Sequence, residues 1–164
     1  MGPDEYPKPV NSYGWAKVAY ESLGFLYASG SLGRRLEVVA LRIAVPRRVR
    51  LEHFLGRSTA RYFREVAGYI RRRDRLQLMC RSIDVPDVRD EDGVPFIIAY
   101  GTSGNPRRFW DISSARIVLG YDPEDDAETE FAAEKRAVPD HGATTVSEAM
   151  VRAAAEYAYR TPAS

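Results

Sequence analysis

The strongest fold signal in this sequence is an amphipathic helix that leads directly into a short apolar strand. Between residues 13 and 28, apolar side chains recur at three- and four-residue spacing, which is typical of one buried helix face. The residues expected on that face are Trp15, Val18, Ala19, Ser22, Phe25 and Leu26. Gly30 and Gly33 end the helix, and a strand rich in branched residues then spans 36–43 until Pro46 stops it. A helix followed by a mostly buried strand favours parallel α/β architecture.

Downstream patterns predict three more helices and one more strand. One helix is expected at about 59–69 and another at about 73–84, closed by Pro86. The second of these should bury one apolar face, made of Leu76, Met79, Cys80 and Ile83. The run 96–100 is expected to form a second strand. Asp111 is placed to cap a short helix. That helix carries Ile112, Ala115 and Leu119 and ends at Gly120.

The last segment is predicted to be an amphipathic helix. Thr145 followed by Glu148 has the spacing of a capping box, in which each residue's side chain satisfies a backbone N–H of the other. The apolar face expected for this helix consists of Val146, Met150, Ala153, Ala154 and Tyr157.

The composition describes a chain that can bury a core and carries almost no net charge. The sequence has 164 residues, of which 45% are hydrophobic and 29% charged, which fits one compact domain. Its 24 Lys and Arg balance 23 Asp and Glu to a formal charge of +1, so no one-signed field exists to attract nucleic acid or an anionic membrane. No apolar run reaches the roughly 18 residues that a membrane span needs. The near-neutral charge therefore predicts a small ligand, and the presence of a single cysteine predicts a reducing cytoplasm as the location.

Few residues suggest metal or disulfide chemistry. The single cysteine cannot form an internal disulfide, and we expect Cys80 to be a small buried hydrophobic residue. His53 and His141 lack partners at catalytic or metal-ligand spacing and are expected at the surface. Six acidic residues lie within 122–130, and we expect a solvated loop there rather than a metal site.

Tyr13 and Lys17 are the residues most suited to chemistry. Four positions apart on a helix, they should share one face, with about 5–6 Å between their Cβ atoms. A tyrosine hydroxyl is a poor base at neutral pH, but a nearby ammonium favours the phenolate form and makes proton exchange with a substrate hydroxyl feasible. Glu21 extends the same row and could pair with Lys17. The alternative is that both residues only pack a helix.

The residues around this pair extend the pattern. Tyr13-Gly14-Trp15-Ala16-Lys17 continues to Glu21 and Leu23, and the following strand ends Ala40-Leu41-Arg42-Ile43. This resembles the extended short-chain dehydrogenase/reductase family, the NAD-dependent epimerase/dehydratase group, whose members show Tyr-Gly-x-Ser-Lys-x-x-x-Glu and then a strand ending Leu-Arg. Ala16 stands where serine is usual.

The resemblance continues along most of the chain. Segment 69–74 is similar to the family's sequence before an Arg-Asp helix. Segments 100–111 and 119–123 look like the tail of the branch that includes uronate dehydrogenases. Branch members that act on uronates carry a serine soon after the strand, whereas this chain has Ala44 and Val45 there, so uronate specificity is not implied.

The resemblance implies roles for particular residues. Tyr13 would be the catalytic acid/base, and Lys17 would hold the nicotinamide ribose of NAD or NADP. Val45 and Pro46 would lie near the nicotinamide. Among the arginines, Arg47 and Arg57 are the best candidates for binding a substrate carboxylate, because guanidinium groups bind carboxylates in bidentate fashion. We expect most other arginines to form a solvated surface that pairs with the acidic segment, and Phe109 and Trp110 to be core residues rather than sugar-stacking ones.

The family's nucleotide-binding elements are not found in this sequence. The family begins with a strand, a glycine-rich turn and a helix that receive the pyrophosphate, and no Gly-x-x-Gly-x-x-Gly turn follows a strand here. We therefore expect the C-terminal part of a Rossmann-type parallel sheet with a small α/β substrate lobe, and a truncated chain that needs an N-terminal half. Residues 1–46 would be the Rossmann remnant, 47–130 the substrate-lobe region with the strand 96–100, and 131–164 a linker and helix.

The implied function is an NAD(P)-dependent oxidoreductase or epimerase of sugars or sugar acids, with hydride transfer and Tyr13 as acid/base. The alternative function is a noncatalytic remnant or interaction module that keeps the fold. We expect the isolated chain to be inactive and to bind NAD and NADP weakly. The uncovered edge of the strand at 36–43 would favour a homo-oligomer or a partner chain that supplies the other half.

Overall fold

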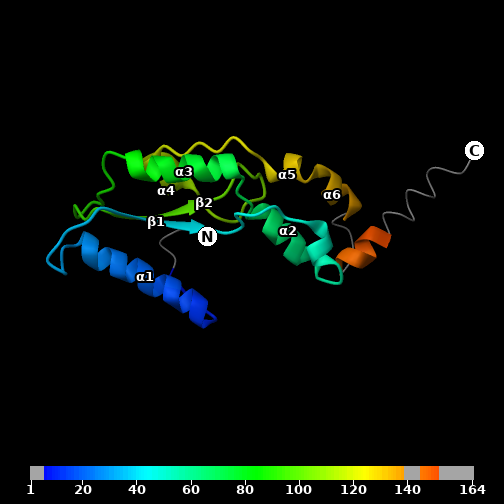
Figure 1. Cartoon of the computed structure of the whole chain (residues 1–164), viewed down its shortest axis with the longest axis horizontal. Helices are drawn as coiled ribbons and strands as arrows, with labels where there is room; N and C mark the ends of the chain where they lie inside the picture. The colour runs from blue at the N-terminus through cyan, green and yellow to red at the C-terminus, as the bar shows by residue number, and fades with distance from the viewer. Residues whose placement is uncertain (1–5, 139–144, 152–164) are drawn as a thin grey trace, which may run out of the picture.

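Branched and other apolar residues form the two strands on which the fold is built. β1 (Val38–Ile43) pairs in parallel with β2 (Phe96–Gly101), in a register that joins Val38 to Phe96 and Ile43 to Gly101. The computed structural model describes residues 6–138 and 145–151, and it places this sheet in the centre of one half of the molecule (Figure 1). The mixed α/β fold with parallel strands, expected from the sequence, is confirmed.

Helices lie on both faces of the sheet. α1 (Ser12–Ala28) lies on one face, and α3 (Arg72–Asp84) and α4 (Ser113–Leu119) lie on the other (Figure 1). Asn11 caps α1, because its side-chain oxygen accepts a hydrogen bond of 2.8 Å from the Gly14 N–H. Gly24 lets the helix approach β1 closely, since a Cβ there would come within 3.1 Å of Val38 Cγ1.

The face of the sheet under α3 and α4 is well packed. The buried residues of this cluster are Ile70, Leu78, Val88, Ala99, Tyr100, Ile112, Ala115, Leu119 and Tyr121. Gly101 leaves no room for a side chain, because a Cβ at this position would collide with Leu78. α4 ends as predicted at Gly120, which has the left-handed φ of 66° that favours glycine.

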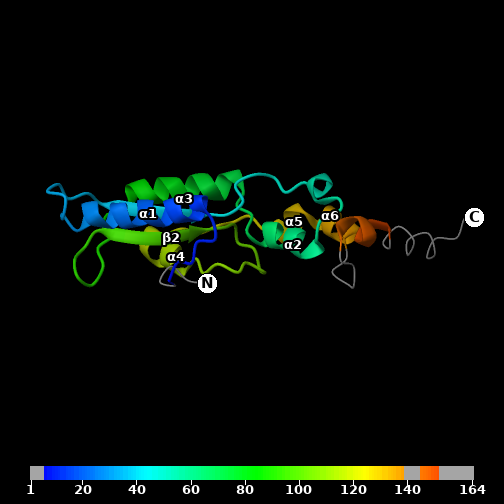
Figure 2. The ribbon, with the colours of Figure 1, turned by 90° about the horizontal axis from the view of Figure 1, so that it is seen from below.

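A second apolar cluster lies beyond the ends of the strands. η1 (Leu51–Phe54), α2 (Thr59–Ala67), α5 (Ala127–Glu130) and α6 (Ala132–Ala137) gather there with the helical residues 146–151. In both views α2, α5 and α6 lie side by side in the half of the molecule away from the sheet (Figure 2). The buried residues of this cluster are Val45, Val49, Phe54, Tyr62, Val66, Tyr69, Ala127, Phe131, Val138, Val146 and Ala149.

The predicted capping box at the last described helix is confirmed. The Glu148 N–H donates to Thr145 Oγ1 and the Thr145 N–H donates to Glu148 Oε2, both at 3.2 Å. Val146 is buried, whereas Met150 is 36% exposed. The other residues predicted for this apolar face, Ala153, Ala154 and Tyr157, lie outside the described residues, as does His141.

Buried polar side chains connect the two clusters. The fully buried Asp74 accepts hydrogen bonds from the Ser103 hydroxyl at 2.5 Å and from the N–H groups of Glu124 at 3.0 Å and Asp125 at 3.2 Å. The buried Asn105 side chain bonds three backbone groups, those of Ala67, Tyr69 and Ala127. Because a buried polar group is costly unless it is hydrogen-bonded, these contacts fix the segments 102–105 and 122–127 against α3 and α2.

The apolar face predicted for α1 is largely exposed, which corrects the sequence analysis. Trp15 is 65% exposed and Phe25 43%, and Ala28 is the buried residue of this helix. Periodicity shows that side chains share a helix face, but not what covers that face. In the described chain, α1 meets the sheet through a few contacts, such as the edge-to-face rings of Phe25 and Phe96 at 5.5 Å.

The buried face predicted for α3 is also wrong. Leu76, Met79 and Ile83 are 49%, 41% and 83% exposed, and Cys80 is exposed too, although it was expected to be buried. The helix instead buries Asp74 and Leu78. A pattern based on hydrophobicity misses this face because one of its two buried residues, Asp74 in the first turn, is a carboxylate whose burial is compensated by hydrogen bonds.

Strand β2 also lies elsewhere than expected. The run 96–100 was predicted to be a strand, which is confirmed, but it was placed in a smaller C-terminal lobe. It pairs along its whole length with β1. Its apolar residues fit this position because a parallel strand with helices on both faces is buried on both sides.

None of the helices within 6–138 and 145–151 is long and apolar enough to cross a bilayer.

Candidate active site

An open hollow of about 1230 Å³ lies on the side of the sheet that faces α1. α1 contributes Tyr13, Lys17 and Glu21 to its lining. The remaining lining residues with functional groups include Arg42 of β1, Arg64 of α2, Tyr100 of β2 and Trp110. The hollow therefore collects side chains from four elements and from the segment after β2, around the pair that the sequence singled out.

Tyr13 and Lys17 lie on one helix face, as their spacing predicted. The Lys17 Nζ atom is 5.2 Å from the centre of the Tyr13 ring and 5.7 Å from that of Tyr20. An ammonium at this distance is attracted to the ring face. Tyr13 is 72% exposed, so its hydroxyl is open to a ligand in the hollow. The Lys17 ammonium thus lies beside the Tyr13 ring at the open side of the hollow.

Glu21 pairs with Arg42 and not with Lys17. Arg42 Nε donates to one Glu21 carboxylate oxygen at 2.7 Å, and Arg42 Nη2 donates to the other at 2.8 Å. Arg42 Nη1 also donates to the Tyr100 hydroxyl at 2.8 Å. The hydrogen bonds that Arg42 donates to Glu21, followed by the one to the Tyr100 hydroxyl, raise the pKa of Arg42 far above its usual value, although burial acts to lower it. This clamp links α1 to both strands at the base of the hollow.

Aromatic residues form another wall of the hollow. Trp110 stacks on Tyr100, with ring centres 4.7 Å apart and an interplanar angle of 28°. Phe109 meets Trp110 edge to face at 5.5 Å, and the Arg64 guanidinium lies 5.2 Å from the Phe109 ring centre. Phe109 and Trp110 were predicted to be core residues, and both are partly buried, with Trp110 packed against the cluster under α3 and α4.

The other predicted site residues lie outside this hollow. Val45 is 9% exposed and packs in the second apolar cluster, and the exposed Pro46 accepts a hydrogen bond from Arg75 at its carbonyl. Arg47 forms an ion pair of 2.8 Å with Glu65. Arg57 is exposed at the surface. The structure thus brings Tyr13 and Lys17 together but does not bring these four residues to them, and their roles stay predictions.

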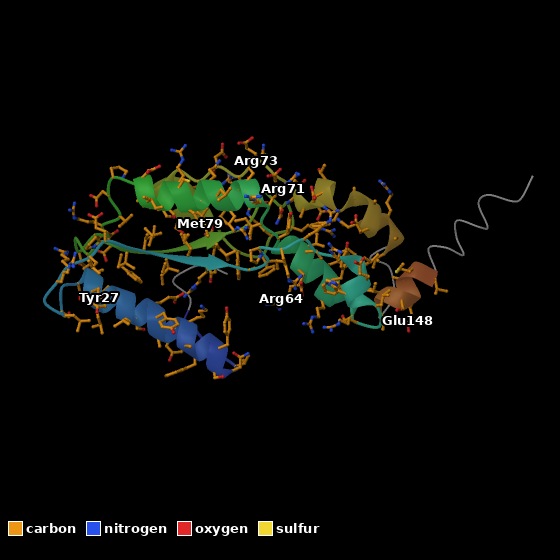
Figure 3. The ribbon with its side chains drawn as sticks, in the orientation of Figure 1. Tyr27, Arg64, Arg71, Arg73, Met79 and Glu148 are labelled. Carbon is orange, nitrogen blue, oxygen red and sulfur yellow. The ribbon has the colours of Figure 1, made fainter. Side chains whose placement is uncertain are left out.

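Four of the arginines that were expected to pair with the acidic segment do so. Arg48, Arg71, Arg73 and Arg107 form ion pairs with carboxylates of the segment 122–130 at 2.6–3.2 Å. Arg71 and Arg73 lie at the start of α3, on the opposite side of the molecule from Arg64 (Figure 3). The acidic segment is therefore neutralised by arginines, and no group of three or more potential metal ligands occurs in the part of the chain that the structure describes.

Sequence reasoning missed Arg42, Tyr100 and Arg64 as site residues. The first could have been found, because a charged residue inside an otherwise apolar strand has to be paired when the strand is buried. Its partner Glu21 was predicted as a neighbour of Lys17 and as part of the family motif, but not as a partner of Arg42. Tyr100 and Arg64 reach the hollow through tertiary packing, and the sequence carries no local signal for that.

Comparisons with known proteins agree with this architecture. No family model matches the chain. The NAD-dependent glucose-6-phosphate dehydrogenase of Haloferax volcanii is 35% identical over 123 residues, which are 75% of this chain and 40% of that protein. The crystal structure of uronate dehydrogenase from Agrobacterium tumefaciens matches with a TM-score of 0.62 at 22% identity, over 92% of this chain and 52% of that one. That of glucuronic acid dehydrogenase from Chromohalobacter salexigens matches with a TM-score of 0.63 at 20% identity and the same coverage.

The sequence match, the shared fold and the order of the motifs agree with one another. The resemblance of this chain to the extended short-chain dehydrogenase/reductase family is confirmed. The chain spans about half the length of the solved relatives and 40% of the curated one. In this chain, α1 is the helix that carries the motif residues Tyr13 and Lys17, and β1 is the strand that contains the Leu-Arg motif.

Proposed function

We propose that this chain provides the proton-transfer and substrate-binding part of an NAD-dependent dehydrogenase of sugars or sugar acids. The observation that carries this proposal is the contact between Lys17 and Tyr13 in a hollow open to a ligand. The relatives support the substrate class, because their names specify dehydrogenases of glucose 6-phosphate, glucuronic acid and uronates.

Tyr13 would exchange the proton of the substrate hydroxyl. When a sugar hydroxyl is oxidised, its proton has to leave, and a phenol oxygen within hydrogen-bond reach can accept it. The ammonium of Lys17, 5.2 Å from the centre of the Tyr13 ring, would bring positive charge to the place where the proton is exchanged. The clamp between Arg42 and Glu21 would hold α1 on the sheet, so that Tyr13 keeps its position relative to the strands.

The residues present fit one end of NAD. The Haloferax relative is named as NAD-dependent, and one mutant of the Agrobacterium enzyme has been solved in complex with NAD. NAD supplies the hydride acceptor when it is bound. Lys17 would contact its nicotinamide ribose, beside Tyr13. Within 6–138 and 145–151, neither β1 nor β2 leads through a glycine-rich turn into a helix that could receive the pyrophosphate, so that end would be held by residues of another segment or chain.

The surface of α1 suits contact with such a nucleotide-binding half. Tyr20, Leu23 and Leu26 are 66%, 44% and 42% exposed along this helix, and β1 pairs on one side with β2. Apolar surface and an open strand edge both favour association. We propose that the nucleotide-binding half, or a partner chain that supplies it, covers this surface. A homo-oligomer would be the other way to cover it.

The experiment compares the 164-residue chain with its fusion to the nucleotide-binding half of the Haloferax relative. Calorimetric titration with NAD and NADP should detect no micromolar binding to the chain alone, because one ribose contact is too little for tight binding. The fusion should bind the cofactor and reduce it slowly in the presence of a sugar or sugar-acid substrate. Micromolar binding of NAD by the chain alone would contradict the division of the site between two halves.

Variants of the fusion test the proton-transfer role. Tyr13→Phe should lower kcat by about 10²-fold or more, the usual scale of general acid/base catalysis, and leave cofactor affinity almost unchanged. Lys17→Ala should lower both kcat and the affinity for the cofactor. Tyr27→Phe is the matched control, since Tyr27 lies at the other end of α1 and outside the hollow (Figure 3). If Tyr13→Phe kept full turnover while the cofactor still bound, a noncatalytic role would be the better description of this helix.

A further inference from the structure

Two arginines line the hollow, and only one of them has a carboxylate partner. Arg42 is held by both oxygens of Glu21 and by the Tyr100 hydroxyl, so all three of its nitrogens are in use. Arg64 has no ion pair with any residue that the structure describes. Acidic partners are found for the arginines at positions 47, 48, 50, 61, 71, 73, 89 and 107, and among the described arginines without one, Arg64 is the one that lines the hollow.

The position of Arg64 on α2 explains why it has no carboxylate partner among the described residues. Glu65, the one acidic residue of α2, is taken by Arg47 at 2.8 Å and approached by Arg61 at 3.9 Å. Arg64 points from α2 to the side of the sheet where α1 lies (Figure 3). Its guanidinium rests over the Phe109 ring at 5.2 Å, a contact that orders the side chain without neutralising it.

The hollow has a local charge that the whole chain lacks. Its lining includes four cationic residues, Lys8, Lys17, Arg42 and Arg64. The single acidic residue of the lining is Glu21, which forms an ion pair with Arg42. Beside these cations, the Trp110 ring, which stacks on the buried Tyr100, adds an aromatic side chain to the lining. Ligand sites typically combine apolar walls with a few polar groups that fix orientation. An anion attached to a small ring compound matches both features.

We propose that Arg64 is the residue that binds the anionic group, a phosphate or a carboxylate, of the sugar that enters the hollow. A guanidinium presents parallel N–H donors that match two oxygens of either group, and its charge makes these hydrogen bonds strong. The assignment differs from the sequence-based choice of Arg47 and Arg57, of which the first is paired with Glu65. It rests on the proposed function for the substrate class, and it names the residue that selects charged over neutral sugars.

Nuclear magnetic resonance titration of the full 164-residue chain tests this proposal without cofactor or turnover. The chain is titrated separately with glucose 6-phosphate, glucuronate and neutral glucose, and the Arg64 Nε–H resonance is followed. At least one anionic sugar should shift this resonance and bind at least about tenfold more tightly than glucose, as expected for charge-assisted hydrogen bonds. The comparison of the two anionic sugars decides between phosphate and carboxylate.

Arg64→Gln should remove that tenfold preference and leave the weak binding of glucose unchanged. Arg61→Gln is the matched control, because Arg61 lies one turn earlier on the same helix, is 60% exposed and lies outside the hollow. Circular dichroism confirms that both variants fold.

The proposal is overturned if Arg64→Gln binds the anionic sugar as tightly as the unchanged chain, or if neither anionic sugar binds more tightly than glucose. Because the readout is binding alone, these results stay separate from the kinetics of Tyr13→Phe, which test the proton-transfer role.

Discussion

Breaking the clamp between Arg42 and Glu21 should destabilise the fold by a measurable amount. The two side chains are 20% and 18% exposed, and their pair shares two hydrogen bonds of 2.7 and 2.8 Å. Removing one partner of a fully buried pair costs about 3–5 kcal/mol, whereas an exposed pair contributes about 0–1 kcal/mol. At this intermediate exposure, we expect Arg42→Met to lower the free energy of unfolding by about 2 kcal/mol, and Glu21→Gln by a similar amount.

A double-mutant cycle followed by urea unfolding measures the interaction itself. The coupling energy between the two substitutions should reach about 1 kcal/mol or more, because each substitution leaves the remaining residue without its oppositely charged partner. For a chain of this length, a loss of about 2 kcal/mol corresponds to a fall in Tm of about 4–8 °C. The control is Arg50–Glu52, a pair 3.5 Å apart with side chains 60% and 64% exposed, whose coupling should stay below about 0.5 kcal/mol. Additive effects at Arg42 and Glu21 would refute the reasoning.

Three further outcomes follow from the packing. Tyr62→Phe should keep or raise stability, because the buried Tyr62 hydroxyl has no hydrogen-bond partner among the described residues. Burial raises the pKa of Tyr62 to about 12, whereas a tyrosine in the unfolded chain has a pKa of about 10. Ionisation of Tyr62 therefore leaves the free energy of unfolding unchanged below about pH 10 and lowers it as the pH rises from about 10 towards 12. Urea unfolding across this range should show a smaller loss of stability in Tyr62→Phe than in the unchanged chain. Gly101→Ala should cost about 1–3 kcal/mol, because the added Cβ collides with Leu78, and an unchanged Tm would disagree with this close approach. Cys80 should react with a thiol reagent in the folded chain almost as fast as in the unfolded chain, and protection of this thiol would contradict its exposure.

The sequence predicted the elements better than it predicted their burial. Helix α1, strands β1 and β2, and the stops at Gly30, Pro86 and Gly120 were all found where local signals placed them. These signals are short-range: the period of the apolar residues, a cap, or a glycine with positive φ. Which face of a helix is covered depends on distant segments. The exposed apolar face of α1 and the buried Asp74 of α3 both show this dependence.

The residues of the candidate site also fall into two groups, those predictable from local spacing and those brought together only by tertiary packing. Tyr13 and Lys17 were predictable because one turn of helix brings them together whatever the rest of the chain does. Arg42 and Glu21 are 21 residues apart, and Arg42 and Tyr100 are 58 apart, so their contacts exist only once α1 has packed on the sheet and β2 has paired with β1. A family motif that contains both Glu21 and Arg42 identifies the residues without stating that they touch.

The balance of charge along the whole chain gave only part of the expectation about ligands. A formal charge of +1 argues against a polyanionic partner, because such partners need a wide field of one sign. It says nothing about a small ligand, which responds to the charges within a few ångströms. Here the acidic segment 122–130 neutralises arginines on one side of the molecule, and the cations that line the hollow therefore face a single carboxylate. The substitution Arg64→Glu would lower the charge of the lining residues from +3, four cations against one carboxylate, to +1, three cations against two carboxylates, and would place a carboxylate where the anionic group is proposed to bind, so it should abolish the preference for anionic sugars more completely than Arg64→Gln does.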